Sequence, residues 1–148
     1  MIRFATPDDA AAILRFIREL AEYEKEPDAV EVDEATLRSQ LSAARPPFEC
    51  LMAEKDGDPV GFALFFPTYS TWRGKAGMWL EDLYVTPAAR GQGFGAALFR
   101  RLGTLATERG YGRLELTALD WNEPAIEFYR RFGAQPMAEW TTWRIDLE

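Results

Sequence analysis

Residues 85–96 form the stretch that decides the fold: Val85-Thr86-Pro87-Ala88-Ala89-Arg90-Gly91-Gln92-Gly93-Phe94-Gly95-Ala96. An apolar run precedes this stretch and a run of helical periodicity follows it, which predicts a strand, a glycine-rich loop and the start of a helix. Glycines let backbone N–H groups approach a ligand closely, and the N-terminus of a helix attracts anions. The stretch therefore predicts a cradle for a pyrophosphate group, to which Arg90 adds a fixed positive charge.

Two other phosphate-binding motifs fit this stretch poorly. Gly91, Gly93 and Ala96 satisfy the G-x-G-x-x-A pattern of dinucleotide-binding folds. However, five residues (Thr86 to Arg90) separate the glycines from their strand, and 148 residues leave no room for a dinucleotide fold with a substrate domain. A P-loop is excluded because no Gly-Lys-Ser/Thr follows. A glycine-rich loop that binds no ligand stays open as an interpretation of this stretch alone.

Strands and helices alternate outward from the glycine-rich stretch. The expected strands are residues 2–5, 48–54, 60–66, 78–85 and 113–119, with one or two more within 137–147. The expected helices begin at Thr6, Asp33, the glycine cluster and Asp120, and a loop is expected over 67–77. This order predicts an α/β (α+β) fold, a central, mostly antiparallel mixed sheet with helices on both faces. The length predicts a single domain over residues 1–148.

Composition limits the available chemistry. The chain has no histidine and one cysteine, Cys50, which excludes imidazole bases, His-ligated zinc and thiolate clusters, and we expect no metal. Acid–base chemistry must therefore come from Asp, Glu, Tyr, Lys, the lone Cys, backbone or water. The net charge of −7 disfavours nucleic-acid binding and favours small cationic ligands. With no apolar run of membrane-spanning length and no signal-peptide pattern, we expect a cytoplasmic protein without a membrane partner.

Several segments carry a specific resemblance. Val85-x₄-Arg90-Gly91-x-Gly93-x-Gly95-Ala96 resembles the acetyl-CoA signature of the GNAT acetyltransferase superfamily, and the order of elements resembles the GNAT acyl-CoA N-acyltransferase fold along nearly the whole chain. Residues 16–24, 79–85 and 120–129 resemble the diamine (spermidine/spermine) and thialysine acetyltransferase branch. The resemblance implies that acetyl-CoA, as cosubstrate, gives its acetyl group to a primary amine of a small cationic molecule such as a polyamine, diamine, thialysine or lysine-like compound. It also implies direct attack in a ternary complex, and a homodimer with C-terminal strands packed across the interface.

The same resemblance implies a set of cofactor-binding residues. A bulge would splay the strand before the glycines, so that backbone groups around Leu83, Tyr84 and Val85 bind the pantetheine arm. The pyrophosphate would lie against Arg90, Gly91, Gln92, Gly93, Phe94, Gly95 and Ala96. Asn122 would contact the cofactor arm, and Tyr129 would bind near the thiol and protonate the departing thiolate.

The resemblance places the amine among Tyr23, Glu24, Glu81 and Asp82, with Glu81 taking the proton of the amine through water. The chemistry independently requires a proton acceptor, because only about a thousandth of an alkylamine is neutral at pH 7. A carboxylate can accept that proton. Adjacent residues of a strand point to opposite faces, so Glu81 and Asp82 share one face only if a bulge intervenes. A salt-bridged structural pair is the alternative for these two acids, as a core aromatic is for Tyr129.

Glu24 falls on the apolar stripe of the first helix, which contains Ile13, Phe16, Ile17 and Leu20. A carboxylate on such a stripe is tolerated where the helix end opens into a wet cleft that receives an ammonium group. Two other functions stay open: acetylation of a protein lysine or N-terminus, and a non-catalytic acyl-CoA-binding sensor.

Overall fold

The computed structural model describes residues 1–147 and forms two units, Met1–Thr117 and Ala118–Glu148. The first unit contains, in chain order, β1 (Ile2–Phe4), α1 (Ala10–Tyr23), α2 (Glu34–Ser42), β2 (Glu49–Lys55), β3 (Asp58–Ser70), β4 (Lys75–Val85), α3 (Phe94–Glu108) and β5 (Leu114–Leu116). The second unit contains one helix, α4 (Glu123–Arg131). The single domain expected over residues 1–148 stays a prediction.

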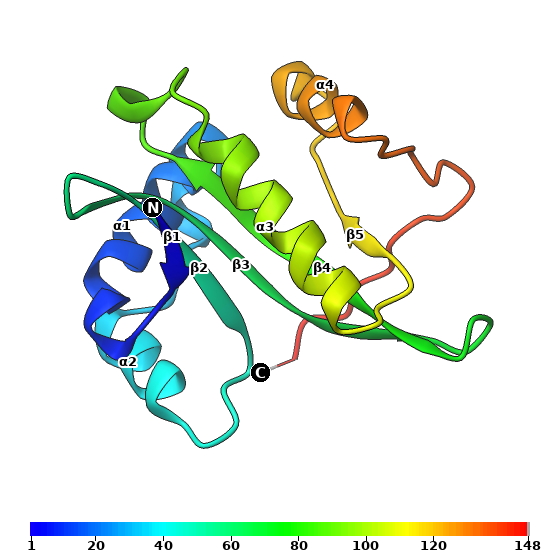
Figure 1. Cartoon of the computed structure of the whole chain (residues 1–148), viewed down its shortest axis with the longest axis horizontal. Coiled ribbons are helices and arrows are strands. Elements are labelled where there is room, and N and C mark those ends of the chain that lie inside the picture. Colours follow the sequence, from blue (N-terminus) through cyan, green and yellow to red (C-terminus); the bar gives the residue numbers. More distant parts are fainter. Residues whose placement is uncertain (148) are drawn as a thin grey trace. The chain divides into compact units, whose positions relative to one another are not determined.

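The five strands form one sheet in the order β1-β2-β3-β4-β5 (Figure 1). The first four strands pair antiparallel with their neighbours, and β5 runs parallel to β4. This arrangement confirms the mixed, mostly antiparallel sheet that the order of elements predicted. It also makes β4 the strand that leads out of the sheet directly into the glycine-rich stretch.

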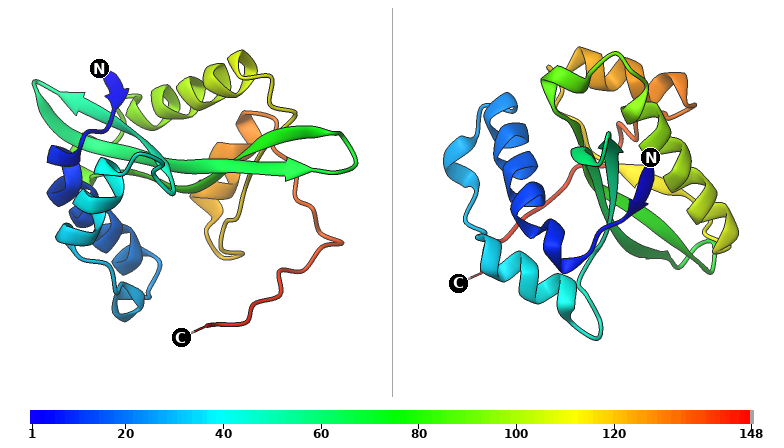
Figure 2. Two further views of the ribbon diagram at one scale, coloured as in Figure 1. Left: turned by 90° about the horizontal axis from the view of Figure 1, so that it is seen from below. Right: turned by 60° about the vertical axis from the view of Figure 1, so that its left-hand side comes forward.

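Helices cover both faces of the sheet, as expected (Figure 2). On one face, α1 packs its buried Ile13 and Phe16 against Phe62 and Tyr84, with the Phe16 and Phe62 rings stacked at 5.7 Å between centroids. On the other face, α3 contributes the buried residues of its apolar stripe, Leu98, Leu102, Leu105 and Ala106. Each face of β4 is therefore backed by a helix, which fixes the strand that carries Glu81 and Asp82.

The hairpin of β3 and β4 is longer than predicted. The loop expected over 67–77 is wrong, because β3 continues to Ser70 and β4 begins at Lys75. Pro67 suggested a loop, but β2 begins only at Glu49, opposite Phe65. Pro67 therefore lies on a stretch where β3 pairs with β4 alone, and a residue without N–H is tolerated there. Tyr69 and Trp72, expected in that loop, are 67% and 87% exposed at the far end of the hairpin.

The expected strands within 137–147 are also wrong, since residues 132–147 contain no strand. Trp143, Ile145 and Leu147 alternate as strand residues do, and they are 91%, 85% and 89% exposed. Alternation describes a side-chain pattern, whereas a strand also needs backbone partners on a neighbour. Residues 137–147 carry no strand, and β5 is likewise confined to three residues instead of the predicted seven-residue span 113–119.

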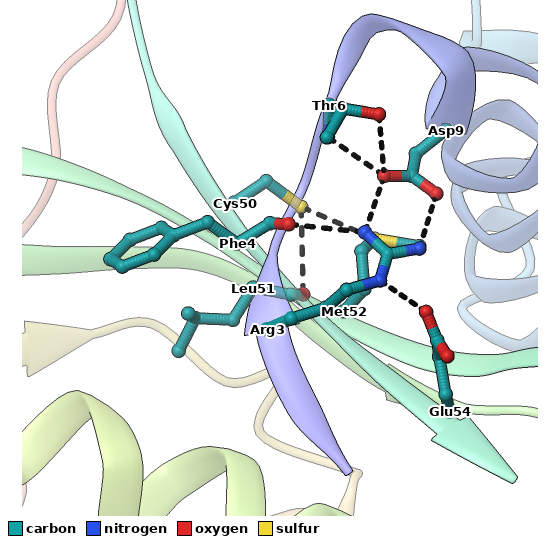
Figure 3. Close-up of polar contacts among 8 residues, drawn as sticks. All are labelled: Arg3, Phe4, Thr6, Asp9, Cys50, Leu51, Met52 and Glu54. Atoms are coloured by element: carbon teal, nitrogen blue, oxygen red, sulfur yellow. Dashed lines mark hydrogen bonds and ion pairs between the residues drawn. The ribbon is translucent and has the colours of Figure 1, made fainter. Parts of the chain in front are cut away.

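A polar cluster fastens β1 to the start of α1 (Figure 3). Arg3 donates from both terminal nitrogens to Asp9, at 2.7 and 2.8 Å, and from Nε to Glu54. Asp9 is 6% exposed and also accepts from the Thr6 backbone N–H at 2.7 Å. These bonds, the one to Arg3 first, lower the pKa of Asp9 against the opposing effect of burial.

Replacing Arg3 by Leu should lower the free energy of unfolding by about 2–4 kcal/mol at pH 7, because it leaves a buried carboxylate without its ion partner. The lowered pKa of Asp9 means that its stabilisation is full above the unfolded value near 4 and is lost as the pH falls below it. Urea denaturation across pH 3–8 measures both effects. Arg38→Leu, which breaks an ion pair with the 96% exposed Asp8, is the matched control and should change little. Equal stability of the Arg3 and Arg38 variants would contradict this role.

Cys50 is a core residue. It is 3% exposed in β2, and burial raises the pKa of its thiol well above the usual value. It therefore stays protonated and unreactive near neutral pH. No helix within residues 1–147 is both long enough and apolar enough to cross a membrane.

Candidate active site

A bulge in β4 lies at Glu81. Leu64 of β3 pairs with Asp82, whereas the next residue, Phe65, pairs with Leu80, so Glu81 is an extra residue without a partner on β3. The register places Asp82 on the α1 side of the sheet, beside Tyr84. The bulge that the resemblance implied is thus found in the strand that precedes the glycines.

The bulge removes the strict alternation between Glu81 and Asp82. The Trp79 indole, which the register puts on the same face as Asp82, donates its N–H to the Glu81 carboxylate at 3.1 Å. Both acids therefore serve one side of the strand, which an unbulged strand would not allow. The sequence analysis did not identify Trp79 as a partner of Glu81. The available signal was that Trp79 lies two residues before Glu81 in the same strand.

Glu24 joins these two acids from the end of α1. It is the C-cap residue of that helix and is half-buried. Burial, and then the charge of Glu81, raise the pKa of Glu24. Burial, followed by the charges of Glu81 and Glu24, raises the pKa of Asp82 to about 7. The negative charges near Glu24 and Asp82 thus disfavour ionisation of these two carboxyl groups, and a bound cation would relieve that effect.

Tyr23, the last residue of α1, is 36% exposed and adjoins Glu24 in the chain. Its role as a wall of the amine pocket stays a prediction.

The glycine-rich stretch opens α3 in the way that an anion site requires. Gly91 and Gly93 have φ of +76° and +87°, a region that side chains disfavour. Gly93 is the N-cap residue, and no side chain caps the helix. The backbone N–H groups of the first turn, at Phe94, Gly95 and Ala96, therefore lack the usual side-chain acceptor. A Cβ placed on Gly91 or Gly93 would meet nothing within 4 Å, so space lies above the backbone.

These features fit the pyrophosphate of acetyl-CoA. Uncovered N–H groups, the positive end of a fifteen-residue helix and open space are the properties that such a group needs. Arg90, beside the glycines, donates from Nε to the Val85 carbonyl at 2.9 Å. Gln92 donates to the Ala88 carbonyl at 3.4 Å, so both side chains also hold the loop that carries the glycines.

Asn122 and Tyr129 belong to the second unit. Asn122 is the N-cap of α4, where its Oδ1 accepts from the Ala125 N–H at 3.4 Å, and it is buried. Tyr129 lies near the end of the same helix, half-buried, with its ring edge-on to Phe128 at 5.3 Å. One helix start and one helix face thus carry the two residues that the resemblance assigned to the cofactor.

Among residues 1–147, no group of three or more Cys, Asp or Glu side chains is arranged to hold a metal ion.

The family model described as the acetyltransferase (GNAT) family matches residues 13–134, from α1 through α4. The chain belongs to the GNAT acetyltransferase family. It is an N-acetyltransferase, and enzymes of this family use acetyl-CoA.

Similar proteins narrow the comparison. The chain is 42% identical to the thialysine N-epsilon-acetyltransferase of Bos taurus over 151 residues, which cover 97% of this chain and 88% of that protein. It is 35% identical to the spermidine/spermine N(1)-acetyltransferase-like protein 1 of Homo sapiens, over 97% of this chain and 22% of that protein. A ribosomal-protein-alanine N-acetyltransferase from Brucella melitensis has a similar structure, with a TM-score of 0.76, 26% identity and 99% coverage of both chains. The branch that the sequence resembled is confirmed by the first two.

Proposed function

We propose that this N-acetyltransferase acetylates the primary amine of a small molecule that carries a second cationic group, such as a diamine, polyamine, thialysine or lysine-like compound. The observation that carries the proposal is that one strand, β4, carries the acidic cluster and leads into the glycine-rich loop. Three acids gather at the bulge of β4, and three residues further on the strand reaches the loop of the anion cradle. About 10 Å of strand separates Asp82 from Val85. This distance allows a cationic amine bound at the acids to meet the acetyl group of a cofactor whose phosphates are bound at the glycine loop.

Acetyl-CoA supplies an acetyl thioester to this site. The N–H groups of Phe94, Gly95 and Ala96 hold its pyrophosphate, aided by Arg90 and Gln92, and backbone groups of Leu83, Tyr84 and Val85 hold the pantetheine arm. Asn122 contacts that arm from the start of α4. The relatives named for thialysine and for spermidine or spermine support an amine as the acceptor.

The acids perform two tasks in this proposal. Glu24 and Asp82 bind the ammonium groups of the substrate, and Glu81, directly or through water, accepts the proton that the reacting amine must lose. The amine nitrogen then forms a bond to the acetyl carbon as the carbon–sulfur bond breaks, and Tyr129 gives its hydroxyl proton to the leaving thiolate. Because the amine attacks the thioester directly, both substrates are bound together and no acyl-enzyme forms.

A second copy of the chain is the proposed partner. The segment from Met137 to Leu147 presents exposed Trp143, Ile145 and Leu147 in strand-like alternation, and exposed apolar side chains in such a row suit a neighbour. A homodimer in which these segments pack across the interface covers them. We further propose that the enzyme works in the cytoplasm without nucleic-acid, membrane or metal partners.

A screen of amines with acetyl-CoA, following release of the free thiol, tests the function. Diamines and lysine-like compounds should be turned over far better than monoamines of equal length. If peptides with a free lysine or N-terminus alone are acetylated, the enzyme modifies proteins. Tight acetyl-CoA binding without thiol release from any amine would make the chain a sensor and would contradict the proposal.

Gly93→Val should raise the Kd of acetyl-CoA by about 10-fold or more, since the positive φ strains a β-branched residue and its side chain fills the space above the cradle. Gly110→Val is the matched control. Gly110 has a φ of +71°, open space around a Cβ, and a position at the opposite end of α3. Calorimetry should show weaker binding only for Gly93→Val, and equal affinities of the two variants would refute the cradle.

Glu24→Gln should raise the KM of a diamine by about 10-fold and change the KM of a monoamine much less, because it removes one charge that reads the distal ammonium group. Added salt should reproduce part of this effect in the wild type. Glu22→Gln, at an exposed acid of the same helix, is the control. Steady-state kinetics with both amines decide the matter, and equal changes in the two KM values would exclude charge reading by Glu24.

A further inference from the structure

Glu19 on α1 holds the end of β4 by two hydrogen bonds. Its Oε1 accepts from the Tyr84 hydroxyl at 3.0 Å and from the Thr86 hydroxyl at 3.1 Å. Its Oε2 lies 3.6 Å from Arg15 Nε, one helical turn earlier. Tyr84 is the penultimate residue of β4 and Thr86 is the first residue beyond it. One carboxylate, far away in the sequence, thus fixes the point where the strand becomes the loop.

The residues that Glu19 holds also contact the cradle loop. The Arg90 guanidinium lies over the Tyr84 ring, 5.4 Å from its centroid, while Arg90 Nε donates to the carbonyl of Val85. The Thr86 N–H donates to Val60 of β3 at 2.8 Å. The Tyr84 hydroxyl therefore donates to Glu19, while the Tyr84 ring contacts Arg90. These two contacts connect α1 to the glycine-rich loop through Tyr84.

Tyr84 is suited to this connection. It is 7% exposed, and its ring lies 6.2 Å from that of Phe16, one turn before Glu19 on α1. Burial, and then the bond to Glu19, raise the pKa of Tyr84, which keeps its hydroxyl protonated as a donor. A donor that stays protonated keeps the contact intact across the neutral pH range.

We propose that Glu19 is a positioning residue for the acyl-CoA cradle: through Tyr84 and Thr86 it fixes the end of β4, and through Tyr84 it places Arg90 beside the glycine loop. This inference rests on the proposed binding of acetyl-CoA at that loop. A cradle that is already ordered loses less conformational freedom when the ligand binds, so its affinity is higher than that of a mobile one. Glu19 itself touches neither substrate in this proposal.

A merely structural bond would predict a different result. Loss of such a bond lowers the melting temperature and leaves the ligand affinity of the folded protein unchanged. Loss of a positioning bond weakens acetyl-CoA binding at temperatures where the variant is fully folded, and it leaves the KM of the amine unchanged. The Kd of acetyl-CoA, measured without turnover, therefore separates the two roles.

The experiment compares the Kd of CoA and acetyl-CoA by calorimetry, with melting curves, in four variants. Glu19→Leu should raise both Kd values about 10-fold, as loss of bonds to a charged group predicts. Glu19→Gln keeps an oxygen acceptor and should recover most of the affinity. The double variant Tyr84→Phe/Thr86→Val removes the same bonds from the other side and should match Glu19→Leu. Glu22→Gln, an exposed acid one turn further on, is the control and should bind as the wild type does.

Combining Glu19→Leu with Tyr84→Phe/Thr86→Val should add little further loss, because both changes remove the same bonds. If Glu19→Leu does not fold, the Tyr84/Thr86 variant decides alone, since it retains Glu19. Unchanged Kd values in these variants, with normal binding by the wild type, overturn the positioning role and leave the proposed function standing. Failure of the wild type to bind CoA overturns the proposed function and this inference with it.

Discussion

Tyr129→Phe should lower the rate of the chemical step by about 10²–10⁴-fold, the usual contribution of a positioned general acid. A thiolate leaves more readily when it receives a proton as the carbon–sulfur bond breaks. The chain has no histidine to supply that proton. A tyrosine hydroxyl, with an ordinary pKa near 10, remains protonated at pH 7 and can supply it. The resemblance to the thialysine branch gives the role to the tyrosine of the last helix, and Tyr129 occupies that position.

The substitution should spare the fold and the cofactor affinity. The Tyr129 ring packs edge-on against Phe128 in α4, and phenylalanine keeps that ring. Single-turnover kinetics with preformed acetyl-CoA complex measure the chemical step even where product release limits kcat. Tyr69→Phe removes the same hydroxyl from a 67% exposed position and is the control. A Tyr129→Phe enzyme with the wild-type single-turnover rate would exclude the acid role.

The conformation of the glycine-rich loop was predictable because it is encoded locally. Gly91 and Gly93 need no distant partner to adopt a positive φ, and the helix that starts at Phe94 follows from its own periodicity. The helix start at Asp33 was local in the same way, and the Asp33 carboxylate accepts from the Thr36 N–H. Signals of this kind lie within a few residues of one another, so they can be interpreted without knowledge of the tertiary structure.

The arrangement of the acids was predictable only in part. Adjacent acids in an apolar strand stood out in the sequence, and the need for a bulge could be stated. Its position depends on the register with β3, where Leu64 pairs with Asp82 and Phe65 with Leu80. Likewise, Glu19 gives no local sign that it will meet Tyr84 and Thr86, more than sixty residues away. Contacts between distant segments are set by packing, which periodicity does not describe.

Two of the wrong predictions share a physical cause. Residues 67–77 were expected to form a loop, and residues 137–147 to contain one or two strands. In both places the outcome depended on whether backbone partners were available. β4 provided them for Thr68 to Ser70, whereas residues 137–147 form no strand.

Asp82→Asn should have opposite effects on stability and on activity. Burial, together with the charges of Glu81 and Glu24, raises the pKa of Asp82 to about 7. The folded protein therefore binds this proton more tightly than the unfolded chain, whose value is near 4. The resulting stability is full below about pH 4 and is lost as the pH rises through 7. At pH 8 the Asn variant, which carries no charge to bury, should be more stable by about 1–3 kcal/mol. Asp58→Asn, at an exposed acid, is the control and should not share this gain.

The same substitution should lower kcat/KM for a diamine by about 10–100-fold, because the ionised carboxylate binds an ammonium group by a charge-assisted hydrogen bond. In the wild type, kcat/KM should rise through pH 7 as Asp82 ionises, beyond the rise caused by the amine itself, and the variant should lack that inflection. Kinetics and urea denaturation at matched pH values measure the two effects together. A variant that loses activity without gaining stability at pH 8 would show that Asp82 is not a strained, repelled carboxylate. An Asp82→Asn variant that gains stability and keeps its activity would show that Asp82 does not bind the ammonium group of the substrate.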